Sequence, residues 1–323
     1  MTSPSSILVY VGLDAVGDGL IKLPFVRALR AAFPQSRITW MAGKGHTVYA
    51  DTLAPLVSGL IDEVLDEAKI GSHWRELLRD PLPGHHFDLI IDTQRRVLTT
   101  LILKRISHSR FISAAAAYVF SDAKPRNRQR PAAMAAQMMS LLVLAGGKSD
   151  SVAAPLPRDS ATEALADRLL PAGPGYVGLA PGAGGKHKCW PLERFCALGA
   201  SIAAKGLVPV FLLGPAEAEW EDFIRANVPG VLLPLQQTRQ ATPMLTIALG
   251  RRMRAAIAND SGTGHMLAAA DIPLISLFGP TPALKFAPST AKLTVVRAQD
   301  FGADTMDAIP ISAVEAALLP SLL

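Results

Sequence analysis

A glycine-bearing turn between an apolar strand and a helix is the stretch of this sequence best suited to chemistry. Residues 258–266 follow a strand-like run, 255–258, and open a helix-like run, 266–270. Backbone N–H groups at a helix start attract an anion, and glycine permits positive φ and close approach of the backbone to a ligand. We expect phosphate to bind here, although such glycines are also typical of an ordinary turn. The residues concerned are Asp260, Ser261, Gly262, Thr263, Gly264 and His265.

A second glycine-rich loop, residues 180–191, follows another apolar strand and ends with a proline at a helix start. It contains Gly184, Lys186 and Lys188, which predict a second anion site. The loop is not a Walker A motif, because no Gly-Lys-Ser/Thr tripeptide opens the helix. Lys188 would offer a point charge to a phosphate. The alternative is that either lysine is a mobile surface side chain.

One carboxylate follows the first strand, in the run Gly17-Asp18-Gly19. Asp18 stands where a helix begins, which suits an N-cap that accepts a backbone N–H. The same position suits a general base in a cleft. No G-x-G-x-x-G pattern follows this strand, which argues against dinucleotide binding and against an NAD-dependent dehydrogenase.

Two further strand ends carry candidates for contacts with a nucleoside. Glu217 and Glu219 follow a very apolar strand, where an acid could hydrogen-bond a ribose hydroxyl or simply favour the first turn of a helix. Phe278 and Gly279 begin a Phe-Gly-Pro-Thr-Pro run, which suits either a base or ribose pocket or an ordinary proline turn.

Basic residues are concentrated between positions 94 and 130. This segment has nine lysines and arginines and a single acid, Asp122. Such a surface attracts a phosphorylated or carboxylated substrate or an acidic membrane, unless its counter-charges lie elsewhere in the fold. No nucleic-acid-binding motif is present, so we expect no nucleic acid partner. The candidates for binding an anionic acceptor are Arg95, Arg96, Arg126 and Arg128.

Strand-like and helix-like runs alternate along the whole chain, which predicts a doubly wound α/β architecture. Strands are expected at 7–13, 37–42, 60–65, 87–92, 110–113, 176–180, 208–213, 231–234, 255–259, 273–278 and 293–297. Helices are expected at 19–33, 47–53, 72–79, 97–106, 130–145, 192–205, 217–227, 243–252, 264–270 and 311–319. A proline-rich break near 150–158 predicts two Rossmann-like domains, 1–155 and 156–323, that face a cleft. The sequence leaves open whether the last helix packs back on the first domain.

The composition is that of a folded globular protein. Of 323 residues, 50% are hydrophobic and 18% are charged, and the formal net charge is +5. The first residues have no basic segment followed by an apolar one, so we expect no signal peptide. The two cysteines favour reduced thiols, and no Cys and His cluster has zinc spacing, so we expect no metal. These features predict a cytoplasmic protein.

Taken in order, the motifs resemble those of glycosyltransferase family 9, the ADP-heptose:lipopolysaccharide heptosyltransferases. The resemblance extends over residues 7–290. The segments that carry it are Gly17-Asp18 with Leu23-Pro24, Lys188-Cys189-Trp190-Pro191, Asp260-Ser261-Gly262 with His265, and Phe278-Gly279-Pro280-Thr281.

The resemblance implies a GT-B-type fold and an inverting, metal-independent transfer of heptose from ADP-heptose, with no further cofactor. It implies an acceptor in the inner core of lipopolysaccharide at the inner membrane face, bound by domain 1–155, and a donor bound by domain 156–323. Asp18 maps onto the catalytic acid of the family and Lys188 onto its phosphate-contacting lysine. Asp260, Gly262 and His265 map onto the donor-binding segment, and Glu217 or Glu219 onto an acid near the ribose.

This chain departs from the family pattern at two places. Pro282-Ala283 stands where members often carry an acid, which leaves the exact donor open, and residues 66–129 show no matching acceptor motif. Two alternatives therefore remain. One is a transferase or epimerase that uses another nucleotide sugar, and the other is a non-catalytic protein that binds a nucleotide or glycan.

Overall fold

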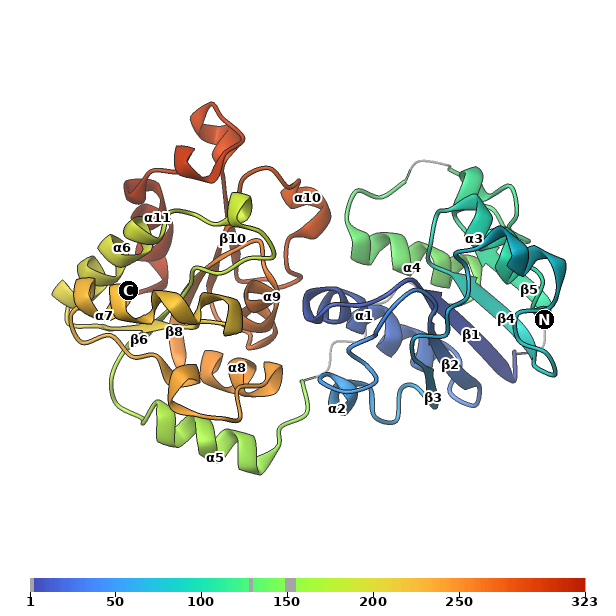
Figure 1. Ribbon diagram of the computed structural model, residues 1–323, viewed down its shortest axis with the longest axis horizontal. Helices are drawn as coiled ribbons and strands as arrows, with labels where there is room; N and C mark the ends of the chain where they lie inside the picture. Colours follow the sequence, from blue (N-terminus) through green and yellow to red (C-terminus); the bar gives the residue numbers. More distant parts are fainter. Residues whose placement is uncertain (1–2, 128–129, 149–154, 323) are drawn as a thin grey trace. The chain divides into compact units, whose positions relative to one another are not determined.

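The computed structural model describes residues 3–127, 130–148 and 155–322. The chain divides into two compact units, Met1–Pro155 (unit 1) and Leu156–Leu323 (unit 2). Each unit is built around a five-stranded sheet whose paired strands are all parallel. Figure 1 shows helices on the faces of each sheet, as the alternation of apolar strands and helices predicts.

Unit 1 has the strand order β3-β2-β1-β4-β5. Its strands are β1 (Ser6–Val11), β2 (Arg37–Ala42), β3 (Glu63–Leu65), β4 (His86–Asp92) and β5 (Ser107–Ser113). The order changes direction between β1 and β4, where Tyr10 is paired with Asp92. In an open parallel sheet such a switch point leaves a crevice at the carboxyl ends of the strands, and ligands bind there.

The helices of unit 1 are short apart from α1 and α4, which pack against each other. They are α1 (Val16–Ala32), α2 (Ala54–Val57), α3 (Val97–Leu103) and α4 (Met134–Leu144), with 3-10 helices η1 (Trp74–Leu78) and η2 (Ala115–Tyr118). Ala116, Ala117 and Tyr118 in η2 all have positive φ, a conformation that is strained for side chains larger than glycine. This strained turn follows β5 at the carboxyl edge of the sheet.

Unit 2 has the strand order β10-β9-β8-β6-β7, with its own switch point between β6 and β8. Its strands are β6 (Tyr176–Ala180), β7 (Val208–Phe211), β8 (Met253–Asn259), β9 (Leu274–Phe278) and β10 (Leu293–Arg297). All five residues of β6 and of β9 are buried. These strands lie between two helical layers, which explains their continuous apolar sequences.

The helices of unit 2 form two groups. In Figure 1, α6 and α11 lie on one side of the sheet and α5 and α8 on the other. The α-helices are α5 (Ser160–Leu169), α6 (Leu192–Ala204), α7 (Glu221–Asn227), α8 (Pro243–Gly250), α9 (Gly262–Ala269), α10 (Ala283–Phe286) and α11 (Ile311–Leu318). The 3-10 helices are η3 (Lys186–Lys188), η4 (Pro215–Trp220), η5 (Pro234–Gln237), η6 (Ala298–Phe301), η7 (Met306–Ala308) and η8 (Leu319–Ser321).

The last helix belongs to unit 2. Val314 and Leu318 of α11 lie in the same buried cluster as Phe195 of α6 and Leu277 of β9. One side of this helix therefore packs into the core of its own unit.

Several predicted elements differ in the structure. The helix expected at 47–53 is a series of turns, because tertiary contacts hold this loop: Asp14 accepts hydrogen bonds from Thr47 and, through its carbonyl, from Val48. The strand expected at 231–234 is a single bridge between Val210 and Leu232, since Pro234 opens η5. The helix expected at 72–79 is the 3-10 helix η1, and that at 217–227 begins as η4.

Helix α5 was not predicted, although its start carries a recognisable signal. The Asp159 carboxylate accepts a hydrogen bond from the Thr162 N–H at 2.8 Å, as an N-cap does. The helix directly follows the proline-rich stretch, whose composition pointed to a linker. Local capping therefore decided the structure where composition was misleading.

Candidate functional site

Three loops at the carboxyl edge of the unit 2 sheet meet at Asp260. Lys188, from the loop after β6, donates to Asp260 Oδ2 at 3.2 Å. Thr281, from the turn after β9, donates to the same oxygen at 2.7 Å. Asp260 itself follows β8. The structure therefore brings together two of the predicted phosphate-binding residues, Lys188 and Asp260, at the switch point of the sheet.

Asn259 fixes the position of the loop that carries Lys188. Its buried side chain accepts a hydrogen bond from the Trp190 N–H at 3.1 Å and donates one to the Pro181 carbonyl at 2.6 Å. The loop that carries Lys188 is thus attached at both ends to the last residue of β8. Asn259 was not among the predicted site residues, although a polar residue at the end of an apolar strand is a recognisable signal.

The predicted anion-binding turn is the first turn of α9. Ser261 is its N-cap and accepts a hydrogen bond from the Gly264 N–H at 3.2 Å. A Cβ on Gly264 would lie 3.1 Å from the Asn259 carbonyl oxygen, so glycine permits close packing of the helix on the strand. Neither Gly262 nor Gly264 has a positive φ, so close approach of the backbone is the property of glycine that this turn uses. His265 follows in the same turn and is buried.

The structure separates the two acids after β7. Glu217 is half-buried, and its carboxylate accepts a hydrogen bond from the Gly214 N–H at 3.0 Å. A Cβ on Gly182 would come within 2.6 Å of the Glu217 carboxyl group, so Glu217 lies directly against the loop that carries Lys188. Glu219 is exposed. Of the two acids, Glu217 is the one that the fold holds at the carboxyl edge beside the site.

Other predicted positions are placed differently. Phe278 is fully buried at the end of β9, so its ring faces the interior of unit 2. Gly279 is also buried, and a Cβ there would lie 2.7 Å from Met306 Sδ. Gly184 and Lys186 are exposed. Across the described residues, no hydrogen bond or ion pair joins Lys186 to Asp260.

In unit 1, Asp18 is the third residue of α1, at the switch point beside β1. It is half-buried, and its Oδ2 accepts a hydrogen bond from the Ala15 N–H at 3.4 Å. The N-cap is therefore Ala15 rather than Asp18, and Asp18 completes the first turn from within the helix. The carboxylate is neither sealed in the interior nor fully surrounded by solvent.

A second carboxylate, Asp14, fixes the start of α1 and was missed by the sequence analysis. Its side chain is completely buried and forms an ion pair with Lys22. It also accepts hydrogen bonds from Trp40 Nε1 at 3.1 Å and Thr47 Oγ1 at 2.8 Å. Asp14 therefore joins α1, β2 and the loop after β2 in one polar cluster. It lies four residues before Asp18 in the sequence.

A third carboxylate ends β4. Asp92 accepts hydrogen bonds from Thr100 Oγ1 at 2.6 Å, Ser113 Oγ at 2.8 Å and the Gln94 N–H at 2.8 Å. Burial raises the pKa of Asp92 to about 6, even though these hydrogen bonds favour the charged form. The group is a structural junction between β4, β5 and α3.

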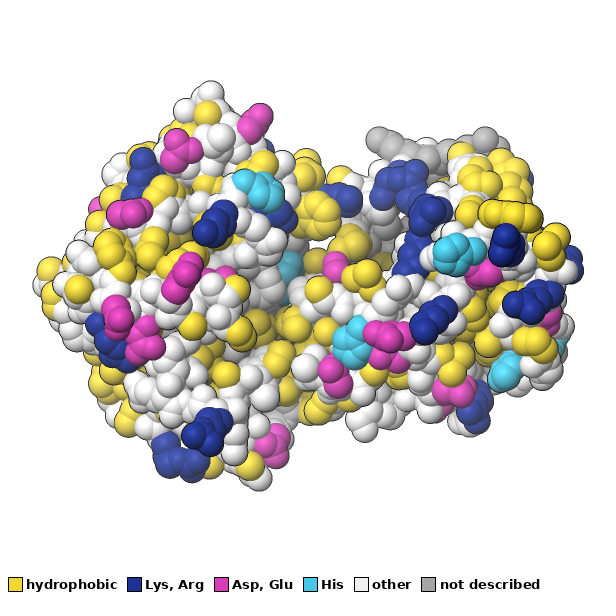
Figure 2. Space-filling view, viewed as in Figure 1, with side chains coloured by type: hydrophobic (Ala, Val, Ile, Leu, Met, Phe, Trp, Pro, Cys, Tyr) yellow, Lys and Arg dark blue, Asp and Glu magenta, His cyan; other side chains and the backbone are white. Residues whose placement is uncertain are grey.

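The basic segment 94–130 divides into two classes of side chain. Arg110 donates to the carbonyls of Leu144 and Ala145 at the end of α4, and Lys104 donates to the Phe120 carbonyl. The candidates Arg95, Arg96 and Arg126 are exposed, and Arg128 lies outside the described residues. Figure 2 shows a group of Lys and Arg side chains on the upper part of unit 1. Part of the predicted patch is therefore structural, and part faces solvent.

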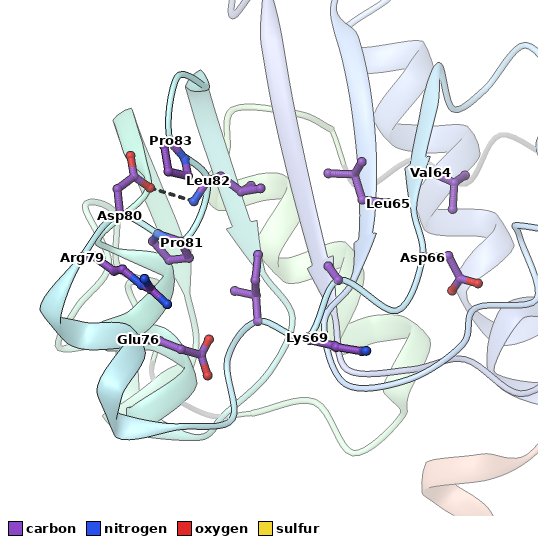
Figure 3. Close-up of a pocket in the computed structure, with 12 residues that line it drawn as sticks. Val64, Leu65, Asp66, Lys69, Glu76, Arg79, Asp80, Pro81, Leu82 and Pro83 are labelled. Atoms are coloured by element: carbon purple, nitrogen blue, oxygen red, sulfur yellow. Dashed lines mark hydrogen bonds between the residues drawn. The ribbon is translucent and has the colours of Figure 1, made fainter.

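A cavity of about 650 Å³ with both apolar and charged lining residues also lies in unit 1 (Figure 3). Val64, Leu65 and Asp66 from the end of β3 form one wall, and the other comes from η1 and the segment after it, with Glu76, Arg79 and Asp80. Glu76 accepts hydrogen bonds from the N–H groups of Gly71, Ser72 and His73 and so shapes the loop between these walls. Charges of both signs make this cavity suitable for a polar ligand.

The described part of the chain has neither a metal-binding cluster nor a membrane-spanning helix. No group of three or more His, Cys, Asp or Glu side chains there is arranged to hold a metal ion. None of the helices within that part is both long and apolar enough to cross a membrane.

Comparison with known proteins identifies relatives of this arrangement. Residues 74–307 match the family model described as glycosyltransferase family 9 (heptosyltransferase). A 125-residue segment is 32% identical to lipooligosaccharide heptosyltransferase 2 of Haemophilus influenzae. That match covers 38% of this chain and 36% of the relative, so it spans little more than a third of the relative's length.

Solved structures share the fold over nearly the whole chain. A glycosyltransferase family 9 protein from Veillonella parvula is 20% identical, with a TM-score of 0.75 over 98% of this chain and 97% of that one. The ADP-heptose lipopolysaccharide heptosyltransferase II of E. coli is 19% identical, with a TM-score of 0.66 over 98% and 100% of the two chains. E. coli heptosyltransferase WaaC, solved with ADP, is 17% identical, with a TM-score of 0.68 over 98% and 99%. The fold is of the GT-B type found in these glycosyltransferases.

Proposed function

The chain belongs to glycosyltransferase family 9, the heptosyltransferase family, and from that premise we propose that it moves a heptose from ADP-heptose to the inner core of lipopolysaccharide. We propose that the transfer inverts the anomeric centre and needs no metal ion. The single observation that carries this proposal is the convergence of Lys188, Asp260 and Thr281 beside the first turn of α9.

The donor side of the proposal uses the anion-binding features of unit 2. The diphosphate of ADP-heptose would lie at the first turn of α9, where backbone N–H groups and the helix dipole favour negative charge. Lys188 adds a positive charge, although Asp260 already offsets part of it through the 3.2 Å ion pair. The helix terminus must therefore supply much of the stabilisation. Glu217 would hydrogen-bond the ribose.

The acceptor side uses Asp18. The acceptor oxygen forms a bond to the anomeric carbon while the bond from that carbon to the β-phosphate oxygen breaks. The electron pair of the broken bond leaves with ADP, and the acceptor proton passes to the Asp18 carboxylate. Negative charge grows on ADP as positive charge grows on the sugar, so Lys188 and α9 stabilise the transition state more than the ground state.

The exposed arginines Arg95, Arg96 and Arg126 would then attract the acidic groups of the acceptor. The proposed place of action is the cytoplasmic face of the inner membrane, where the protein would act as a soluble or peripheral enzyme. Steep weakening of acceptor binding with salt is expected from such contacts. If acceptor binding did not depend on salt, these arginines would not contribute to acceptor binding.

The deciding experiment is mass spectrometry of reactions that contain ADP-heptose and a panel of truncated lipopolysaccharide cores. One core should gain the mass of one heptose, with release of ADP. Calorimetry should show ADP binding more tightly than UDP or GDP. Preference for UDP or GDP would favour a transferase or epimerase for another nucleotide sugar, and ADP binding without turnover on any core would favour a non-catalytic binder.

A further inference from the structure

Helix α4 has an unusual surface for a helix at the outside of a domain. Its eleven residues, Met134–Leu144, include no charged side chain. A helix that is apolar on all sides is normally buried on all sides. Here only Met138, Leu141 and Leu142 are buried, and Val143 is 47% exposed. One face of α4 packs into unit 1, whereas the opposite apolar face has no covering element in the described part of unit 1.

This uncovered face lines a groove of about 720 Å³, a volume typical of ligand sites. The floor is formed by residues of α4, and the other wall is the segment 124–126. The lining residues are Ala136, Met139, Ser140, Val143 and Leu144 from the helix, with Lys124, Pro125 and Arg126 opposite. Apart from one hydroxyl, the floor offers only hydrocarbon and a thioether. It can bind an apolar chain and has little to offer a sugar.

The opposite wall adds charge of a single sign. Lys124 and Arg126 are exposed, and no carboxylate is among the residues that line the groove. Within the described ranges, neither side chain forms an ion pair. Lys104 and Arg110 of the same segment are engaged with backbone carbonyls, as described above. Lys124 and Arg126 therefore place two exposed positive charges beside the apolar groove.

An apolar groove flanked by two cations is complementary to an anionic amphiphile. We propose that the groove over α4 binds an anionic membrane lipid, with its acyl chain along Met139 and Val143 and its phosphate between Lys124 and Arg126. This inference rests on the proposed function in one respect: a lipid-linked acceptor gives the enzyme a reason to work at a membrane. The groove would hold unit 1 at the bilayer surface, as apolar faces with flanking basic residues do in proteins that lie at the interface.

Two other occupants fit the observations less well. In a symmetric contact with a second copy, Lys124 and Arg126 of the two copies would come close together, and like charges disfavour such an interface. A nucleic acid strand would need aromatic rings for its bases to stack on, and none lines the groove. Self-association nevertheless gives a distinct result in the vesicle experiment.

The test is co-sedimentation of the full chain with vesicles of phosphatidylcholine, with or without about one third phosphatidylglycerol. Binding should require the anionic lipid and should weaken with salt. Val143→Glu should reduce it at least about tenfold, because a carboxylate enters the apolar floor beside the phosphate, and Lys124→Ala should reduce it about fivefold. Val143→Leu should bind like the wild type. Leu319→Glu, at a position in unit 2 with 50% exposure, is the matched control and should have no effect.

A second readout separates this proposal from the proposed function. With a deacylated, water-soluble acceptor, Val143→Glu should turn over at the wild-type rate, whereas with the acceptor embedded in anionic vesicles its KM should rise by about the same factor as the binding loss. If no heptose transfer is seen with either acceptor, the proposed function fails while the vesicle assay still decides the lipid site. The proposed lipid site would be overturned by any of three results. These are equal binding to neutral vesicles, unchanged vesicle binding by Val143→Glu, and self-association of the wild type that Val143→Glu abolishes.

Discussion

The Asp18 carboxylate can serve the helix and the reaction at the same time. One of its oxygens accepts the Ala15 N–H at 3.4 Å. A carboxylate has about four lone-pair sites on its two oxygens, so the second oxygen can still accept a proton from a substrate. The structural and the chemical interpretation of this residue are therefore compatible.

Asp18→Asn separates these two roles. The amide oxygen of asparagine can still accept the Ala15 N–H, but the side chain cannot take a proton. Turnover should fall by about 10²–10⁴, the usual contribution of a general base, while ADP affinity stays within about twofold. Steady-state kinetics with ADP calorimetry provides the measurement, and Glu219→Gln, at an exposed acid, serves as the control. Near-normal turnover by Asp18→Asn would remove Asp18 from the mechanism.

Lys188 and Lys186 form a matched pair for testing the donor site. Both lie in η3, but Lys188 is in contact with Asp260 and Lys186 is exposed. Lys188→Ala should lower kcat by about 10²–10³, as loss of one preorganised electrostatic contact does, and should weaken ADP binding as well. Lys186→Ala should change both values little. Equal effects of the two substitutions would indicate general attraction of the nucleotide rather than a specific contact.

At the scale of the element, α1 is held in place by charges that are out of contact with water. The buried Asp14–Lys22 pair connects the start of the helix to Trp40 of β2. Removing one partner of such a pair leaves the other charge buried and uncompensated. The orientation of Asp18 depends on this cluster because both acids are at the start of the same helix.

Asp14→Ala should therefore destabilise unit 1 by about 3–5 kcal/mol. Asp167→Ala breaks a pair whose acid is 60% exposed and should cost no more than about 1 kcal/mol. Urea unfolding measures the two changes in the free energy of unfolding. Amide exchange in α1 and α5 shows in which unit each change occurs. Similar losses in both variants would show that water reaches the Asp14 cluster.

Asp92 predicts a pH dependence of stability. Its folded-state pKa is raised to about 6, so the folded protein binds this proton more tightly than the unfolded chain. The stabilisation is complete below the ordinary pKa of about 4 and is lost as the pH rises through about 6. The stability of Asp92→Asn relative to the wild type should therefore increase by roughly 2 kcal/mol from pH 4 to pH 7. Thermal unfolding across this range provides the measurement, and parallel profiles would exclude a raised pKa.

At the scale of the whole molecule, we propose that the donor and acceptor roles belong to different units. Unit 1 has the order β3-β2-β1-β4-β5 and unit 2 the order β10-β9-β8-β6-β7, and each has one switch point. Asp18 follows β1, at the first switch point, whereas Lys188 and Asp260 follow β6 and β8, at the second. This division gives each candidate residue to the unit whose sheet edge can hold the corresponding ligand.

Hydrogen exchange tests this division of labour. Addition of ADP should protect amides in the segments 181–191 and 260–266, because the nucleotide rests on the carboxyl edge of the unit 2 sheet. Amides near Asp18 should be unaffected by ADP alone. Protection that is confined to unit 1 would reverse the proposed roles of the two units.

Much of the architecture could be predicted from local patterns. Continuous apolar strands predict parallel sheets, because a strand that is buried on both faces has no polar side. The break near Pro155 predicts that these strands form two separate α/β units. The family resemblance, confirmed by the match over residues 74–307, came from short motifs whose order the chain itself carries. The candidates Asp18, Lys188 and Asp260 were found in this way, since each lies in the segment between a strand and the first turn of the next helix.

Only the tertiary structure decided which of these candidates meet. It joined Lys188 to Asp260 across 72 residues, favoured Glu217 over Glu219, buried Phe278, and showed that Asp14 and Asp92 are the acids enclosed by protein. These outcomes depend on which strands are neighbours and on how far a side chain lies from water. Strand adjacency and burial depend on contacts between residues far apart in the chain, so local sequence does not determine them. Capping, periodicity and turn chemistry depend only on nearby residues, so they can be predicted from the sequence.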